Sequence, residues 1–191
     1  MDNKNSIAGV RAPSFLSTAK ELRVIFEMLA MASFRSRLDT IKCGDGHPIV
    51  IAPSFMTGDG GTAAMRAFLR RSGFAAYGWE QGRNTGLCEQ VYLGPVLKLY
   101  EMLNPGAMTD PMLEWGDCWR NTPSVPSTAI YSEGDGIVDW NLCVDKTLSA
   151  QTENLRVPGS HVGLTHNLAV MYAIADRLAQ REGQWRPFDL S

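Results

Sequence analysis

Two residues in the last third of the chain, Asp135 and His161, are of the types that form an acid–base pair in enzymes. Each follows a short β-branched or apolar segment and a turn: residues 127–132 precede Asp135, and residues 154–157 precede His161. In α/β sheets the loops at the carboxyl ends of the strands form the ligand crevice, so the two side chains can meet there. Asp135 and His161 are therefore candidates for an acid and a base at one site. Taken alone, Asp135 is equally explained as a turn residue, since Asp-Gly is a turn dipeptide, and His161 as a capping or solvated histidine.

A glycine-rich segment at residues 54–61 offers backbone N–H groups to a negatively charged ligand. The chain has no G-x-x-x-x-G-K-[ST], and residues 58–61 do not fit G-x-G-x-x-G, so no nucleotide cofactor is predicted. The N–H groups of Phe55 and Met56, directly after a predicted strand, are candidates for an oxyanion hole that stabilises charge on an acyl carbon. A flexible turn without a binding role is the simplest interpretation of the same residues.

The candidate residues lie among alternating predicted strands and helices. The continuous apolar run at 48–53 is typical of a strand buried on both faces of a parallel sheet. A helix at 62–72 and a strand at 74–79 complete one βαβ unit. The remaining predicted elements are a helix at 95–103, an irregular segment at 108–126, strands at 127–132 and 153–157 with a helix from about Asp139 between them, and a closing helix with a core stripe of Leu164, Leu168, Met171, Ala175 and Leu178.

An amphipathic helix is predicted over residues 14–34. Leu22, Ile25, Phe26 and Leu29 recur at helical spacing, with charged residues off that stripe. We expect the apolar stripe to pack on the core. The alternative is a helix that binds a membrane surface or a partner protein, although its polar face is mixed in sign rather than basic.

Length and composition indicate one globular domain over residues 1–191. Hydrophobic residues make up 45% of the chain and charged residues 20%, and the net charge of -2 gives no reason to expect nucleic acid or an anionic membrane as a partner. The alternation of strands and helices predicts an α/β fold, with about four mostly parallel strands flanked by helices.

The four cysteines are far apart and form no C-x-x-C pair, so neither a metal site nor a disulfide scaffold is predicted. We interpret them as free thiols. No signal pattern or apolar run long enough to span a bilayer is found, so a cytoplasmic location is the expectation.

Four segments together resemble bacterial lipase-like or esterase-like α/β hydrolases: residues 48–55, 73–84, 127–138 and 159–167. The resemblance covers most of the chain. Such enzymes have Pro-Gly-Phe or His-Gly-Phe where this sequence has Pro53-Ser54-Phe55, an acid in the Asp-Gly-Ile-Val turn and a base in the Gly-Ser-His turn. The resemblance thus implies the same roles for Asp135 and His161, and a carboxylic-ester substrate.

The chain departs from this family because the G-x-S-x-G nucleophile elbow is absent. A βαβ unit needs about 30 residues, and the stretch from 84 to 126 is already occupied by a predicted helix and an irregular segment. We therefore predict that the elbow is deleted between about residues 87 and 93. Cys88 and Ser54 are weak candidates for a replacement nucleophile, and His166 is the alternative base.

Two functions follow from these patterns. The first is a lipase- or esterase-like hydrolase that retains acid and base but is impaired by the loss of its nucleophile. The second is a truncated, non-catalytic relative that binds an apolar ligand or a protein partner. Loss of central strands would also leave exposed sheet edges, through which the chain could form oligomers.

Overall fold

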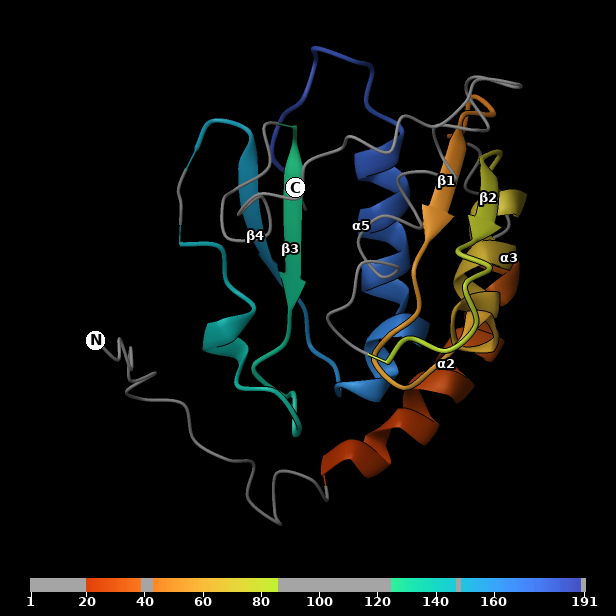
Figure 1. Ribbon diagram of the computed structural model, residues 1–191, viewed down its shortest axis with the longest axis vertical. Helices are drawn as coiled ribbons and strands as arrows, with labels where there is room; N and C mark the ends of the chain where they lie inside the picture. Colours follow the sequence, from red (N-terminus) through yellow and green to blue (C-terminus); the bar gives the residue numbers. More distant parts are fainter. Residues whose placement is uncertain (1–19, 39–42, 86–124, 147–148, 190–191) are drawn as a thin grey trace.

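The computed structural model describes residues 20–38, 43–85, 125–146 and 149–189 (Figure 1). The predicted helix at 95–103, the irregular segment at 108–124, Cys88 and the expected position of the missing elbow lie outside these ranges. In chain order the elements are η1 (Lys20–Arg23), α2 (Val24–Leu38), β1 (Pro48–Ile51), η2 (Asp59–Thr62), α3 (Ala63–Arg71), β2 (Ala75–Gly78), β3 (Ser127–Tyr131), η4 (Trp140–Leu142), β4 (Thr152–Arg156), η5 (Val162–His166) and α5 (Leu168–Leu178).

The described strands form two separate parallel pairs, β1 with β2 and β3 with β4. Pro48 is opposite Ala75 in the first pair, and Ser127 is opposite Thr152 in the second. The α/β class and the parallel pairing are as predicted, but the four strands of the described ranges do not form a single sheet. In the described part of the chain no strand joins β1 to β3, so each of the four strands keeps one edge without a described strand partner.

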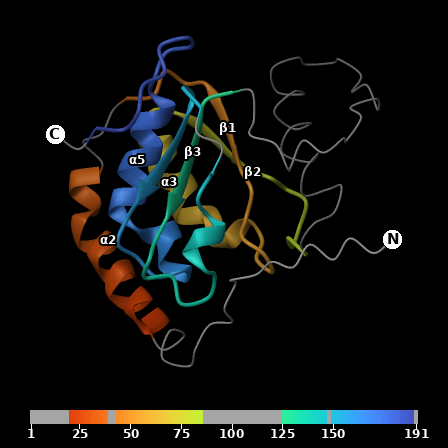
Figure 2. The ribbon, with the colours of Figure 1, turned by 90° about the vertical axis from the view of Figure 1, so that its left-hand side faces the viewer.

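Helices connect the two strand pairs in place of strand pairing. The core combines Met65, Phe68 and Leu69 of α3 with Met171 and Ala175 of α5. Apolar residues from both strand pairs pack against this cluster, and α5 contacts α2, α3 and η5. In Figure 2, α5 lies between α2 on one side and β1 and β2 on the other. The stripe is therefore confirmed as a core-facing surface, with Leu168 and Leu178 partly buried at its margins. Leu164 also packs on the core but lies in η5, because the helix itself begins only at Leu168.

The β1–α3–β2 unit is confirmed with small shifts of its ends. Its entry and its helix-to-strand turn come into direct contact, because the Gly44 N–H donates to Ser72 O (2.9 Å) and the Gly46 N–H to Gly73 O (2.9 Å). A Cβ on Gly44 would lie 2.4 Å from the Gly73 carbonyl carbon, and Gly73 has φ +104°. Two glycines are needed where the backbones approach this closely. The β1 residues are only half-buried, in contrast to the strand buried on both faces that the apolar run predicted.

The orientation of α2 is the opposite of the prediction. Leu22 and Phe26 are 70% and 72% exposed, and Ile25 and Leu29 are exposed as well. The half-buried residues lie at three-residue spacing on the other face and include two glutamates: Glu21, Val24, Glu27 and Ala30. The prediction was wrong because both glutamates hydrogen-bond to turns of the protein, so the polar face is the one that packs.

Only one 3₁₀ turn, η4, is found in the described residues where a helix from about Asp139 was predicted. The Asp139 carboxylate accepts from the Asn141 N–H and side-chain amide, which closes a short turn. Asp145 lies six residues after Asp139, and the Asn154 side chain hydrogen-bonds to both its N–H and its carbonyl. These local side-chain bonds compete with helical hydrogen bonds and explain the difference.

Across the described ranges, no helix is both long and apolar enough to cross a membrane.

Candidate active site

The predicted acid and base lie in hydrogen-bonding contact. His161 Nδ1 is 2.7 Å from Asp135 Oδ2, and the other carboxylate oxygen accepts the N–H groups of Ile137 (2.8 Å) and Val138 (2.7 Å). The Asp135 side chain is 5% exposed and that of His161 is 34% exposed. An ionised carboxylate only accepts hydrogen bonds, so Nδ1 is the donor, and in the neutral form of the imidazole Nε2 is the nitrogen that carries a lone pair. We call these two residues the Asp–His pair.

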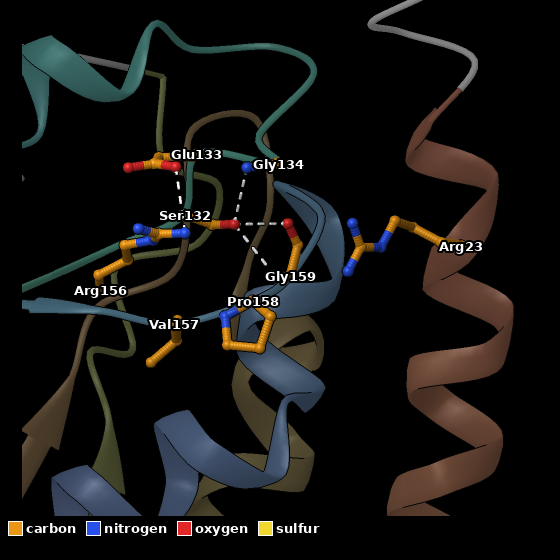
Figure 3. Close-up of a pocket in the computed structure, with 8 residues that line it drawn as sticks. All are labelled: Arg23, Ser132, Glu133, Gly134, Arg156, Val157, Pro158 and Gly159. Atoms are coloured by element: carbon orange, nitrogen blue, oxygen red, sulfur yellow. Dashed lines mark hydrogen bonds and ion pairs between the residues drawn. The ribbon is translucent and has the colours of Figure 1, made fainter.

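The parallel register of β3 and β4 explains why residues so far apart in sequence meet. Both strands end at the same level, and each is followed by one of the two turns. Ser132, 2% exposed, joins the turns: its hydroxyl donates to Gly159 O (2.7 Å) and accepts from the N–H groups of Gly134 and Gly159 (3.0 Å each; Figure 3). This three-bond contact, here called the serine clasp, holds the turns together next to the strands.

Two carboxylates from the N-terminal helix complete the site, and sequence reasoning did not identify them. Glu21 Oε1 accepts the N–H groups of Gly136 (2.8 Å) and His161 (2.9 Å), and Glu21 Oε2 accepts that of Val162 (3.1 Å). A glutamate can occupy a half-buried position when backbone donors satisfy its charge. The signal was present in the sequence as two acidic residues six positions apart on one helix face, but their partners are more than 100 residues away.

Glu27 fixes the residue immediately before His161. Its carboxylate accepts the Ser160 N–H (2.9 Å) and the Ser160 hydroxyl (2.7 Å), and it pairs with Arg23 Nε at 3.3 Å. Gly163 follows two residues after His161, and a Cβ there would lie 1.4 Å from Glu27 Oε2. The glycine therefore leaves the space that the Glu27 carboxylate occupies.

In the part of the chain that the structure describes, no hydroxyl or thiol is hydrogen-bonded to His161 Nε2. The Ser160 hydroxyl is bound to Glu27, and Ser54 lies in the exposed loop after β1. Cys143 is near enough to feel the Asp135 charge, but burial first, then Asp135 and Asp139, raise the pKa of its thiol. A raised pKa leaves less thiolate, so Cys143 is not an activated nucleophile.

The loop that carries the oxyanion-hole candidates is fixed to the loop after β2. The Met56 N–H donates to Asn84 O (2.6 Å), and the Asn84 N–H donates back to Thr57 O (2.8 Å). Met56 also has φ 62°, a left-handed conformation that is unusual for a residue with a side chain. The Met56 N–H is therefore committed within the protein, while Phe55 beside it is exposed. Their role at an oxyanion remains a prediction.

A pocket of about 500 Å³ lies beside the Asp–His pair, but neither Asp135 nor His161 lines it. Arg156 in its wall pairs with Glu133 at 3.3 Å. Figure 3 shows Arg23 of η1 pointing toward this region from the opposite side. The residues of the serine clasp form part of the pocket wall. The pocket is lined by Arg23, Ser132, Glu133, Gly134, Arg156, Val157, Pro158 and Gly159.

The alternative base, His166, is the last residue of η5, and its Nδ1 is 2.9 Å from the Thr165 hydroxyl. No carboxylate of the described segments is hydrogen-bonded to it in the way that Asp135 is to His161. Among the residues described, no group of three or more His, Cys, Asp or Glu side chains could hold a metal ion.

Comparisons of the chain with protein-family models, with curated proteins and with solved structures found no match. The geometry of the Asp–His pair and the residues around it therefore provide the evidence on function.

Proposed function

We propose that this chain is α/β-hydrolase-like and carries the acid–base half of an ester-hydrolase site. The observation that supports the proposal is the 2.7 Å contact between Asp135 and His161, with the second Asp135 oxygen bound by two N–H groups. In such a pair the aspartate holds the imidazole in one tautomer and stabilises the positive charge that develops on it. His161 Nε2 is then the group that accepts a proton.

The expected activity is limited to what a base without a neighbouring nucleophile can do. No acyl-enzyme is formed at the described residues, because none of their hydroxyl or thiol groups is hydrogen-bonded to His161. Instead, His161 Nε2 accepts a proton from a water molecule as that water attacks the ester carbonyl. General-base assistance of this kind contributes about 10²–10⁴-fold, well below the total acceleration of a complete serine hydrolase.

Hydrolysis of p-nitrophenyl acetate and butyrate by the purified full chain tests this proposal. We expect turnover above the buffer rate, and we expect His161→Ala to lower it by about 10²-fold or more. His166→Ala is the matched control, because it removes the other histidine of the same segment and leaves the Asp–His pair intact. Equal activity of wild type and His161→Ala, with both proteins folded, would refute the proposal.

A second candidate function is binding of an apolar ligand or a protein partner, and the outward apolar face of α2 favours it. Leu22, Ile25, Phe26 and Leu29 are all exposed on one helix, and such clustered apolar surface often marks an interaction site. Binding of a fluorescent apolar probe, compared between wild type and the Ile25→Ser/Phe26→Ser variant, tests this function. Undiminished binding by the double variant would argue against the α2 face as the site.

A further inference from the structure

We propose that Glu21 is a positioning residue that sets the geometry of the Asp–His pair. Its carboxylate accepts one N–H from the turn of Asp135, that of Gly136, and two from the turn of His161, those of His161 itself and Val162. This inference rests on the proposed function, since it concerns how the acid and the base of that site are held.

The decisive feature is a single oxygen shared by the two turns. Glu21 Oε1 is 2.8 Å from the Gly136 nitrogen and 2.9 Å from the His161 nitrogen, so both turns approach one atom. Hydrogen bonds to an ionised carboxylate are about twice as strong as neutral ones. The Glu21 carboxylate therefore limits how far the backbone of His161 can move from that of Gly136, which directly follows Asp135.

Each turn has hydrogen bonds that stabilise it separately. Those bonds do not fix the position of Asp135 relative to His161. The two N–H bonds to Asp135 Oδ1 stabilise only its own turn, and Glu27 contacts only the turn of His161. The serine clasp joins the turns one residue before Asp135 and two before His161. Glu21 joins them at Gly136 and at His161 itself.

This arrangement separates folding from positioning. When Glu21 is removed, the serine clasp and the parallel β3–β4 pair still hold the turns near each other, so the fold persists. The distance between His161 Nδ1 and Asp135 Oδ2 is then free to fluctuate. A misplacement of about 1 Å costs roughly 10²-fold in rate when catalytic groups must be aligned.

Glu21 itself is held by the same helix face that packs on the turns. It lies in η1, which leads directly into α2, and Glu27 binds Ser160 one residue before His161. Glu21 therefore joins the two turns from the N-terminal helix, whereas Ser132 joins them from the segment between β3 and β4.

The experiment combines nuclear magnetic resonance of the His161 ring with ester turnover, both on the full chain. We expect wild type to show a slowly exchanging ring Nδ1 proton, the signature of its bond to Asp135. Glu21→Ala should lose this resonance and should lower kcat by about 10- to 100-fold with little change in KM. Glu133→Ala is the matched control: Glu133 neighbours the same turn but pairs with Arg156 and touches no N–H of the pair.

Retention of the resonance and of kcat in folded Glu21→Ala would overturn the inference. If Glu21→Ala gives no cooperative melt, Glu21→Gln decides: its amide nitrogen faces an N–H donor, so at least one of the three bonds is lost and the resonance should weaken. A Glu21→Gln resonance of wild-type intensity would then overturn the inference. Wild type with the resonance but without ester turnover refutes the proposed function alone, whereas a resonance that is unchanged in folded Glu21→Ala refutes the positioning role of Glu21 alone.

Discussion

Replacement of Ser132 by alanine tests how the two turns of the candidate site are held together. The Ser132 hydroxyl makes three hydrogen bonds, to the Gly159 carbonyl and to the N–H groups of Gly134 and Gly159, and the side chain is almost fully buried. Ser132→Ala removes all three and changes little in volume. The Gly134 and Gly159 groups are then left without this partner.

The cost is governed by Gly159, because Gly159 is buried whereas Gly134 is half-buried and can be hydrated more easily. A buried polar group left unsatisfied costs about 1–3 kcal/mol. For the N–H and C=O of Gly159 together, we expect the free energy of unfolding to fall by about 2–4 kcal/mol, since the two losses are not fully additive. In a domain of this size that lowers Tm by roughly 4–16 °C.

Urea unfolding followed by circular dichroism measures this change, with an unchanged m-value as evidence that only stability has altered. Ser127→Ala is the matched control, because Ser127 belongs to β3 as well but its hydroxyl donates to one exposed carbonyl, that of Val125. We expect the control to lose less than about 0.5 kcal/mol. A loss of the same small size for Ser132→Ala would show that the hydrogen bonds of the serine clasp do not stabilise the fold as expected.

Three further changes test separate parts of the structure. Asn167→Ala removes the side-chain cap of α5 and should cost about 1–2 kcal/mol in urea unfolding; an unchanged midpoint would contradict the cap. Gly44→Ala would place a Cβ 2.4 Å from the Gly73 backbone and should cost about 1–3 kcal/mol, seen as a lower Tm, whereas wild-type stability would show that the backbones can separate. Burial and the Asp135 charge raise the pKa of the Cys143 thiol. At neutral pH we therefore expect alkylation of Cys143, measured by peptide mass spectrometry, to be slower than that of a cysteine in a short peptide and to become faster in Asp135→Asn. Equal rates in wild type and variant would refute the charge effect.

Local pattern was sufficient for the elements with strong periodicity. The α3 helix and the α5 stripe could be predicted because apolar residues repeat at helical spacing and the same face is the one that becomes buried. The β1–α3–β2 unit followed from the order of these patterns. The helix expected after Asp139 was not formed, because the Asp139 and Asn154 side chains accept backbone N–H groups in bonds that favour turns.

Periodicity could not decide which face of α2 is buried. The apolar stripe of Leu22 and Phe26 is exposed, and Glu21 and Glu27 face the protein instead. Burial of a carboxylate is favourable only where donors are supplied to it. Those donors come from turns more than 100 residues away, so no local property of the helix could reveal them.

The sequence by itself determined the α/β class, the order of the described strands and the identity of the two titratable residues, Asp135 and His161. These depend on residue type and on spacing along the chain. Tertiary structure alone decided that the strands form two parallel pairs, that the Asp–His contact is 2.7 Å, and that Ser132 and Glu21 join the two turns. The physical reason is that hydrogen bonds between distant segments depend on positions in space, which spacing along the chain does not specify.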